Sequence, residues 1–349
     1  MKKTLALVFA ILLLAVSLVG CGGAGGEKTT IHLLNWGEYL EPTLIDQFQK
    51  ENPDIIVKFT NTTSNEEMYT VCATEGTEID IVVPSDYLVE RFINEDLLAE
   101  LDLNNIPNFK YVEEVSKTRT FDPESKYSIP YMMGTVGIVY NKTLVDEPVD
   151  SWDILWDEKY SGQILMYDSI RDSMMVALAK LGYDINSTDP EEIAKAGELL
   201  MQQKPLVYAY LTDEIRTSMI GGSVALAVDY SGAAVGAIQE NSDLDYVVPK
   251  EGSNVWVDNL VVLKSSKNKE AAERFINFLC DPEVSKKNSE YIGYTTPNAE
   301  AMKMIDPELL ENPAYPISSD VLDRCEYYKD LGDDLSLYND VWMKLRTAG

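Results

Sequence analysis

The stretch TTIHLLNWGEYLEPTLIDQFQKEN, residues 29–52, contains the first strand and the first helix that the sequence predicts. TTIHLL is a short apolar run of the kind found in strands. PTLIDQFQKEN places Leu44, Ile45 and Phe48 on one face of a helix, and Pro42 lies near the first helical position, where proline is favoured. The stretch is therefore interpreted as a strand followed by a helix.

The same strand–helix unit recurs along the chain. Strand-like apolar runs appear at DIIVKFT, IDIVV, GQILMYD, SVALAVD and WVDNLVVL, with helical patterns between them. Continuous apolar runs such as IDIVV are typical of strands that are covered on both faces. Alternation of this kind predicts an α/β protein with mainly parallel sheets. Ser85 and Ser169 are expected as N-caps of the helices that follow them.

Two stretches are interpreted as crossings between two domains. YMMGTVGIVYN, residues 131–141, carries Gly134 and Gly137 in an extended run, and PKEGSNVW, residues 249–256, is a turn that leads into another strand. Extended crossings with small residues can serve as hinges. We expect a first lobe of residues 29–134 plus 257–302 and a second lobe of residues 135–256 plus 303–349.

The N-terminus has the pattern of a secretory signal. Two lysines precede the uncharged run TLALVFAILLLAVSLVG, which ends at Cys21 and is followed by GGAGG. LVGC resembles a bacterial lipobox, so we expect a signal peptide of residues 1–20, a lipid on Cys21 and a glycine-rich tether over 21–28. A membrane span is the alternative, because no charge appears between Lys3 and Glu27.

The chain is strongly acidic, with 29 Lys and Arg against 58 Asp and Glu and a net charge of −29. Removal of residues 1–20, which carry two lysines and no acid, makes the charge −31. This balance argues against nucleic-acid binding, whose affinity comes from neutralised phosphates. It favours cationic partners only weakly, because most of the acids are expected on solvated faces.

The cysteines and the single histidine do not indicate a disulfide framework or a metal site. Cys72, Cys280 and Cys325 are an odd number, and the first two lie in helical, apolar-periodic runs, so buried and inert thiols are expected rather than a disulfide framework. His32 lies inside the first strand with no metal-ligand spacing around it. We therefore expect neither a metal site nor a cofactor.

The end of the first strand is a candidate ligand wall. Trp36, Glu38 and Tyr39 fall within four positions, and strand ends are where a parallel sheet usually presents its ligand. An aromatic ring beside a carboxylate suits an organic cation. A core tryptophan beside a solvated glutamate is the alternative on this stretch alone.

Acids and aromatics also gather at later strand ends. In NVWVDNL, Trp256 and Asp258 are two apart and point to the same face of a strand. The other candidates are Ser85 and Tyr87 in PSDYLVERF, Asp168, Ser169 and Asp172 in YDSIRDS, Tyr230 in VDYSGAA and Tyr294 in IGYTTPN. For Asp172 the alternative is a favourable interaction with a helix dipole. For Tyr87, Tyr230 and Tyr294 the alternative is packing at the edge of the core.

At this point the chain resembles a known family. LNWGEYL with FQKE, PSDYLVERF, LAKLGYDINSTDPEEI, WVDNLVVL, FINFL and IGYTTPN, in this order across residues 29–349, are similar to the polyamine-binding lipoproteins and periplasmic proteins of spermidine/putrescine ABC transporters. IGY-x-TPN and LGY…N-x-TDP are the most distinctive motifs. The resemblance implies a two-lobed α/β fold of the type II periplasmic-binding-protein kind, with a ligand cleft between the lobes.

The resemblance also implies roles for individual residues. Aromatic walls fall on Trp36, Tyr87, Tyr230, Trp256 and Tyr294, amine-holding acids on Asp172 and Asp258, an acid at the pocket edge on Glu38, and polar contacts on Ser85 and Thr212. Tyr39 is expected in the wall of the first lobe.

Four departures from the spermidine-binding pattern put the ligand preference in doubt. Ser169 stands where an aspartate is expected, which leaves Asp168 as a candidate stand-in. Tyr328 replaces a glutamine, Tyr230 a tryptophan and Gly37 a threonine.

The resulting prediction is an extracytoplasmic binding protein of an ABC importer, and not an enzyme. A polyamine is a methylene chain with ammonium ends, so aromatic faces cover it and carboxylates accept its N–H donors. The expected partners are a polyamine, a permease with its ATPase, and the outer face of the cytoplasmic membrane through the Cys21 lipid; a monomer is expected. Closure of the lobes would form the surface that the permease recognises.

Three other readings remain possible from sequence. A cysteine enzyme lacks a histidine placed to activate a thiol, although paired carboxylates for glycoside hydrolysis stay open. A binding protein for a sugar, a cationic amino acid or ferric iron is a second alternative. A sensor that presents the same ligand to a receptor is compatible with the same pocket.

Overall fold

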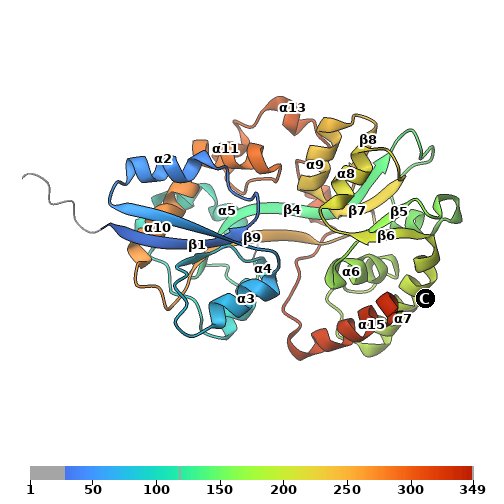
Figure 1. Ribbon diagram of the computed structural model, residues 1–349, viewed down its shortest axis with the longest axis horizontal. Coiled ribbons are helices and arrows are strands. Elements are labelled where there is room, and N and C mark those ends of the chain that lie inside the picture. The colour runs from blue at the N-terminus through green and yellow to red at the C-terminus, as the bar shows by residue number, and fades with distance from the viewer. Residues whose placement is uncertain (1–27, 118, 348–349) are drawn as a thin grey trace, which may run out of the picture.

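The computed structural model describes residues 28–117 and 119–347 (Figure 1). The predicted signal peptide and Cys21 lie outside the described residues, as does the tether apart from Lys28. Among the helices of the described part, none has the length and apolar character needed to cross a membrane.

A mixed sheet runs through the described residues in the order β2-β1-β3-β9-β4-β7-β5-β6, with β8 paired to β4. Its strands are β1 (Thr29–Trp36), β2 (Ile55–Thr62), β3 (Ile81–Val82), β4 (Ser128–Asn141), β5 (Ile164–Tyr167), β6 (Val207–Leu211), β7 (Leu226–Tyr230), β8 (Leu244–Val247) and β9 (Val255–Val262). The predicted strands are present, and β6 and β8 are additional.

The long strand β4 joins the two parts of this sheet. Its first half pairs with β9, and its second half, from Val136 to Asn141, pairs with β7 and β8. In Figure 1, β4 and β9 run together from the β1–β3 side to the β5–β8 side. We call β1–β3 with their helices the first lobe and β5–β8 with theirs the second lobe. The α/β, two-lobed fold class is confirmed. Two of the three predicted lobe boundaries fall inside β4 and β9 and the third follows Met302, and all three stay a prediction.

The expectation of mainly parallel pairing is wrong. β1 is parallel to β2 and β3, and β5 to β6 and β7, but β3–β9 and all the pairs of β4 are antiparallel. β4 and β9 cross between the lobes in opposite directions, which makes them antiparallel. Both are buried along nearly their whole length, so their sequences are as uniformly apolar as those of covered parallel strands.

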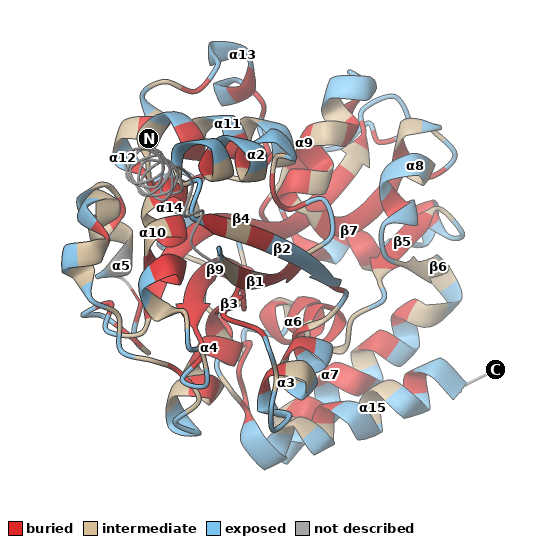
Figure 2. Ribbon diagram, turned by 60° about the vertical axis from the view of Figure 1, so that its left-hand side comes forward, coloured by how far each residue is buried: buried red, intermediate tan, exposed pale blue. Residues whose placement is uncertain are grey.

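Helices cover both faces of the sheet. They are α2 (Thr43–Glu51), α3 (Asn65–Ala73), α4 (Asp86–Asn94), α5 (Glu113–Ser116), α6 (Ile170–Lys180), α7 (Pro190–Gln203), α8 (Glu214–Ile220), α9 (Ser231–Glu240), α10 (Lys269–Leu279), α11 (Pro282–Ile292), α12 (Ala299–Met302), α13 (Pro307–Leu310), α14 (Ser319–Leu322) and α15 (Leu335–Thr347). Short 3₁₀ turns are η1 (Leu103–Asn105), η2 (Pro107–Tyr111), η3 (Trp152–Trp156), η4 (Glu158–Tyr160), η5 (Lys204–Leu206) and η6 (Gly332–Asp334). Figure 2 shows that the central strands of the sheet are buried, that the edge strands β2 and β6 are partly exposed, and that the outer faces of the helices are exposed.

In the first lobe, the two faces of the sheet have separate cores. Leu44 and Phe48 of α2 pack with Phe275 of α10, while Leu88 and Phe92 of α4 belong to a cluster with α3. The amphipathic pattern of each helix therefore decides which face it covers.

The predicted N-caps differ in outcome. The Ser169 side chain accepts a hydrogen bond from the Asp172 backbone N–H and caps α6, as expected. Ser85 stands at the N-cap position of α4 but makes no capping bond, and its hydroxyl instead accepts from the Asn65 amide at 3.1 Å. The prediction that Ser85 caps α4 is therefore wrong, because a side chain from α3 competes for its oxygen.

Two of the three thiols, Cys72 and Cys280, are buried as expected, whereas Cys325 is half-buried. Cys72, Cys280 and Cys325 are free; the first two are buried, and burial raises the pKa of both to about 12. A thiol with so high a pKa is a poor nucleophile at neutral pH.

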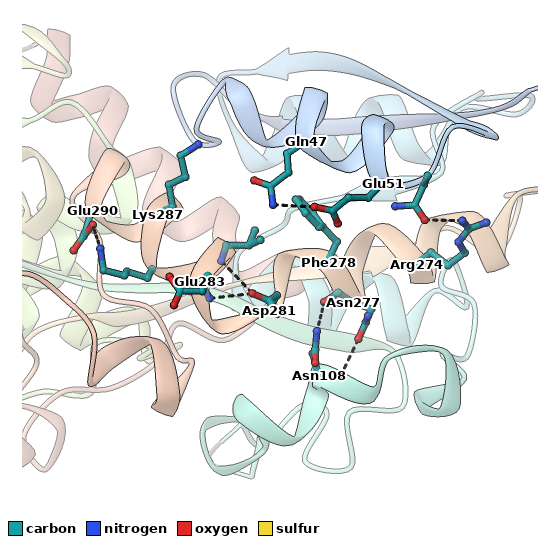
Figure 3. A pocket seen from close by; sticks show the side chains of 13 residues that line it. Gln47, Glu51, Asn108, Arg274, Asn277, Phe278, Asp281, Glu283, Lys287 and Glu290 are labelled. Atoms are coloured by element: carbon teal, nitrogen blue, oxygen red, sulfur yellow. Dashed lines mark hydrogen bonds and ion pairs between the residues drawn. The ribbon is translucent and has the colours of Figure 1, made fainter.

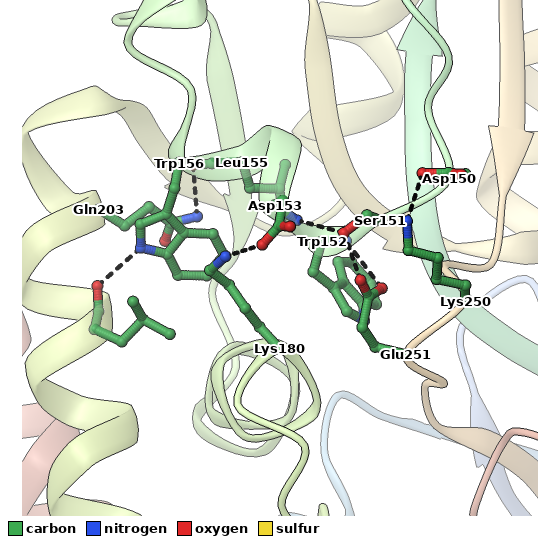
Figure 4. A network of polar contacts seen from close by, with 11 residues as sticks. Asp150, Ser151, Trp152, Asp153, Leu155, Trp156, Lys180, Gln203, Lys250 and Glu251 are labelled. Atoms are coloured by element: carbon green, nitrogen blue, oxygen red, sulfur yellow. Dashed lines mark hydrogen bonds and ion pairs between the residues drawn. The ribbon is translucent and has the colours of Figure 1, made fainter.

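The crossing PKEGSNVW is tied to the second lobe by a polar network (Figure 4). The Trp152 indole N–H donates to the Gly252 carbonyl at 2.9 Å, and Glu251 accepts from the Ser151 hydroxyl. Gly252 has φ +93°, and a Cβ there would lie 2.2 Å from the Arg324 carbonyl oxygen. Only glycine therefore fits at position 252. The segment that leads from the second lobe into β9 is thus held in place by these contacts.

Candidate binding site

Four aromatic side chains from both lobes meet where β9 crosses the sheet. The ring of Trp256 lies edge-to-face with Tyr294 at 4.8 Å and with Tyr230 at 6.3 Å between centroids, and Tyr294 meets Tyr39 at 5.8 Å. Tyr39 follows β1, Tyr230 ends β7, and Tyr294 follows α11. Residues that are distant in sequence thus form one aromatic cluster.

Two glycines make this close packing possible. A Cβ at Gly134 in β4 would lie 2.2 Å from Cζ2 of Trp256, and a Cβ at Gly232 in α9 would lie 2.4 Å from Cε1 of Tyr294. Gly134 was interpreted from sequence as a hinge residue. The structure gives it a packing role, because the indole ring occupies the space of the missing side chain.

Asp258 lies beside this cluster near the Ser85 and Tyr39 hydroxyls, and one of its two carboxylate oxygens has no hydrogen-bond donor. It is 5% exposed and forms an isolated β-bridge with Ser85, yet its Oδ1 accepts no hydrogen bond. Two neighbouring polar atoms, the Tyr39 hydroxyl and Nε1 of Trp256, are also buried without partners. Burial raises the pKa of Asp258 to about 6, although the Ser85 and Tyr39 hydroxyls partly oppose this rise. A buried carboxylate oxygen without a donor is costly, so the geometry favours a cationic donor here.

Asp172 is surrounded quite differently. It is 2% exposed and lies in the first turn of α6. Its Oδ2 accepts from the Tyr230 hydroxyl at 2.8 Å, and its Oδ1 accepts from the Tyr328 hydroxyl at 3.0 Å. Because Tyr230 is also a member of the aromatic cluster, Asp172 lies next to the same cluster as Asp258.

Two further predicted residues border this region. Tyr87 packs against the core clusters of both lobes, and its hydroxyl donates to Glu66 at 3.4 Å. Trp36 packs in the first lobe, where its indole N–H donates to the Val83 carbonyl at 2.9 Å.

Three predicted residues are not brought into the cluster. Asp168 is exposed and forms an ion pair with Arg346 of α15 at 3.1 Å. Thr212 is exposed, with its hydroxyl 3.4 Å from Glu214. Glu38 is exposed in a turn with φ +40°, which places it on the rim rather than in the interior.

Sequence reasoning missed several residues of this region. Asp86 is fully buried between Ser85 and Tyr87, and burial followed by the Asp258 charge raises its pKa well above the usual range. Tyr131 donates its hydroxyl to the Tyr39 carbonyl at 2.7 Å, and Tyr167 lies edge-to-face with Tyr230 at 4.8 Å. Asp86 and Tyr167 are next to predicted site residues, and Tyr131 lies inside a predicted crossing. This closeness in sequence is the only signal by which the sequence could have indicated them.

Another buried acid, Asp229, precedes Tyr230 in β7. Its Oδ1 accepts a hydrogen bond from the Tyr230 backbone N–H at 2.8 Å, and burial raises its pKa to about 7. The interior near the aromatic cluster is therefore rich in carboxyl groups.

A surface hollow of about 740 Å³ in the first lobe contains none of these residues (Figure 3). It is lined by α2, α10 and α11, and its polar groups bond to their neighbours. Arg274 pairs with Asp54, and the Asn108 backbone N–H donates to Asn277 at 2.9 Å. Because these groups are satisfied, the hollow lacks the partnerless acceptor that marks Asp258.

The fold and the cluster together define a class. Two α/β lobes joined by paired crossing strands, with aromatic and acidic side chains between them, are the architecture of a type II periplasmic binding protein. The family model described as bacterial extracellular solute-binding protein matches residues 43–317, and the chain belongs to this family.

Individual relatives agree with this assignment. The chain is 36% identical to the spermidine/putrescine-binding periplasmic protein of Escherichia coli, over 92% of this chain and 93% of that protein. Its structure is similar to that of the spermidine/putrescine ABC transporter substrate-binding protein PotD of Streptococcus pneumoniae, with TM-score 0.82 and 37% identity over 91% and 99% of the two chains. It is also similar to the Tp0655 (TpPotD) lipoprotein of Treponema pallidum, with TM-score 0.83 and 28% identity over 91% and 100%. These relatives are transport proteins rather than enzymes.

Proposed function

We propose that this protein is the substrate-binding component of an ABC importer and that its ligand is a polyamine, spermidine or putrescine. The observation that carries the proposal is the partnerless Oδ1 of Asp258, which is buried beside the Tyr39 hydroxyl and the Trp256–Tyr294 ring pair. An ammonium group supplies donors to the carboxylate and the phenol oxygen, and aromatic rings cover the methylene chain.

The expected interaction free energies are sufficient for micromolar binding. Cation–π contacts contribute about 0.5–2 kcal/mol each, and a hydrogen bond to a charged group contributes about 1.5–3 kcal/mol. Two acid-held ammonium groups with several aromatic contacts reach about 8 kcal/mol, which corresponds to a micromolar Kd. Ordering the flexible ligand subtracts from this sum.

The proposal includes the cellular setting. Cleavage before Cys21 would leave a lipid-anchored monomer on the outer face of the cytoplasmic membrane, where it delivers its ligand to a permease and ATPase. The LVGC motif supports the anchor, as does the similarity to a lipoprotein of Treponema pallidum. The lobe boundaries inside β4 and β9 suit a hinged closure around the aromatic cluster.

Titration calorimetry of the protein without residues 1–21 tests the proposal. The titrants are putrescine, spermidine, spermine, lysine and maltose. We expect micromolar or tighter binding of at least one polyamine and no heat from lysine or maltose. Absence of binding heat from all three polyamines would overturn the proposed ligand class, and binding of maltose would point to a sugar-binding protein.

A further inference from the structure

Helix α4 of the first lobe meets the second lobe outside the two crossing strands. The Tyr87 ring packs against core clusters of both lobes. Further along the same helix, Oε2 of Glu90 accepts a hydrogen bond from the Asp330 backbone N–H at 3.0 Å. Residues three positions apart lie on the same side of a helix, so Tyr87 and Glu90 belong to one surface of α4.

The segment that contains Asp330 is fixed to the second lobe. The Lys329 carbonyl accepts a hydrogen bond from the Arg171 guanidinium of α6 at 3.2 Å. On the other side of Asp330, Leu331 is buried in a core cluster with residues of α6, α7 and α15. The hydrogen bond between Glu90 and Asp330 therefore joins one lobe to the other.

The contact depends on a hydrogen-bond acceptor rather than on an ion pair. The Glu90 carboxylate forms no second hydrogen bond and no ion pair with the described residues. The facing segment carries one cation, Lys329, and the acids Asp330, Asp333 and Asp334, so it offers Glu90 no net attraction of charge. An amide oxygen at position 90 could accept the same backbone N–H.

A contact between the lobes affects how tightly a ligand is held between them. The Glu90–Asp330 hydrogen bond exists only while the two surfaces lie together, so it stabilises the closed arrangement relative to an open one. The apparent affinity of a ligand that binds the closed form is proportional to the fraction of closed protein.

We propose that Glu90 is a positioning residue: it holds the lobes closed through the Asp330 backbone N–H and so raises the affinity of the site without touching the ligand. This inference rests on the proposed function for the ligands with which affinity is measured. The contact between the lobes can also be tested without a ligand.

The test combines titration calorimetry with small-angle X-ray scattering of the ligand-free protein. The titrants are putrescine, spermidine and spermine, and the variants are Glu90→Ala, which removes the acceptor, and Glu90→Gln, which keeps an acceptor oxygen. Glu95→Ala is the matched control from the end of the same helix. Glu95 accepts from Arg91 at 2.9 Å and from the Tyr69 hydroxyl at 2.8 Å, both within the first lobe.

We expect Glu90→Ala to weaken the binding of all three polyamines by one common factor of about five, the scale of one hydrogen bond, if the free protein is mostly open. If the free protein is mostly closed, the same variant should have a larger radius of gyration than wild type. Glu90→Gln and Glu95→Ala should match wild type in both measurements. Thermal melting shows whether each variant is folded.

Unchanged affinity together with an unchanged radius of gyration in Glu90→Ala would overturn the inference. A loss confined to one polyamine would also overturn it, because Glu90 would then contact that ligand directly. Equal effects of Glu90→Gln or of Glu95→Ala would contradict it too, since they would assign the effect to charge or to damage of α4.

Failure of the proposed function gives a different result. Wild-type protein that binds none of the three polyamines would overturn the proposed ligand class. A larger radius of gyration in Glu90→Ala but not in Glu95→Ala would still support the contact between the lobes, and equal radii of all variants would overturn both proposals.

Discussion

The two acids that flank the aromatic cluster differ in what surrounds them. Asp258, on the crossing strand β9, has a buried oxygen without a donor, whereas both oxygens of Asp172, on α6, accept phenol hydroxyls. Of the two acids, only Asp258 therefore has a buried oxygen that is still free to accept a hydrogen bond from a ligand. The same residue type is thus left with an unpaired oxygen on β9 and is fully hydrogen-bonded by its neighbours on α6.

The largest effect on affinity is expected from removing the charge of Asp258, the residue on which the proposed function rests. Asp258→Asn should weaken polyamine binding by about 1–3 kcal/mol, because the ammonium loses a charged acceptor. Titration calorimetry measures the loss. Asp168→Asn is the matched control, since Asp168 pairs with Arg346 at an exposed position and should leave affinity unchanged. Equal affinities of wild type and Asp258→Asn would remove Asp258 from the site.

Gly134→Ala tests whether the binding of both ends of the ligand depends on the aromatic cluster. The new Cβ would lie 2.2 Å from the Trp256 ring, so the indole must move. Overpacking of this kind costs about 2 kcal/mol of folding stability. All polyamines should bind more weakly by a similar factor.

Thermal melting and calorimetry measure the two effects. Gly221→Ala is the control, because its Cβ would meet two carbonyl oxygens, of Thr217 at 3.4 Å and of Ser218 at 3.7 Å, at ordinary contact distances. Losses confined to one polyamine would mean that the wall serves only one end.

Acidification should weaken binding through Asp258. Its pKa of about 6 means that lowering the pH from 7 to 5 protonates most of this carboxyl group and removes its charge. Affinity should fall about tenfold at pH 5, in line with the fraction still ionised. The free protein responds with the opposite sign: a carboxyl pKa raised by folding lowers stability as the pH rises toward 6 and through it.

Calorimetry at pH 5 and 7 on wild type and Asp258→Asn measures this effect. The pH dependence should largely disappear in the variant. If Asp258→Asn keeps the full dependence, another carboxyl group controls it, and Asp86, which lies between Ser85 and Tyr87, is the next to examine.

The smallest effect is expected at the rim. Glu38 is exposed, so Glu38→Gln should change affinity by less than about 1 kcal/mol, the scale of solvent-exposed ion pairs. Because a rim acid contacts only a ligand that reaches it, the losses for putrescine and spermidine should differ. Equal losses in parallel titrations would contradict a role at one end of the site.

Local sequence signals were sufficient for the elements and for part of the site. The covered strand IDIVV, the helix of Leu44 and Phe48, and the cap at Ser169 follow from apolar spacing and from side-chain oxygens next to backbone N–H groups. Trp256 and Asp258 could be paired because alternate strand residues share a face. The antiparallel crossing of β4 and β9 could not be predicted, because burial on both faces gives antiparallel and parallel strands the same composition.

The sequence by itself determined the kinds of side chain that this protein supplies: aromatics and acids at strand ends on both sides of two crossings. The tertiary structure decided which of them meet. It placed Asp168 in an ion pair with Arg346, joined Asp172 to Tyr328, 156 positions away, and left one oxygen of Asp258 without a partner. Hydrogen bonding and burial depend on distances between segments far apart in the chain, and those distances exist only after the sheet has formed.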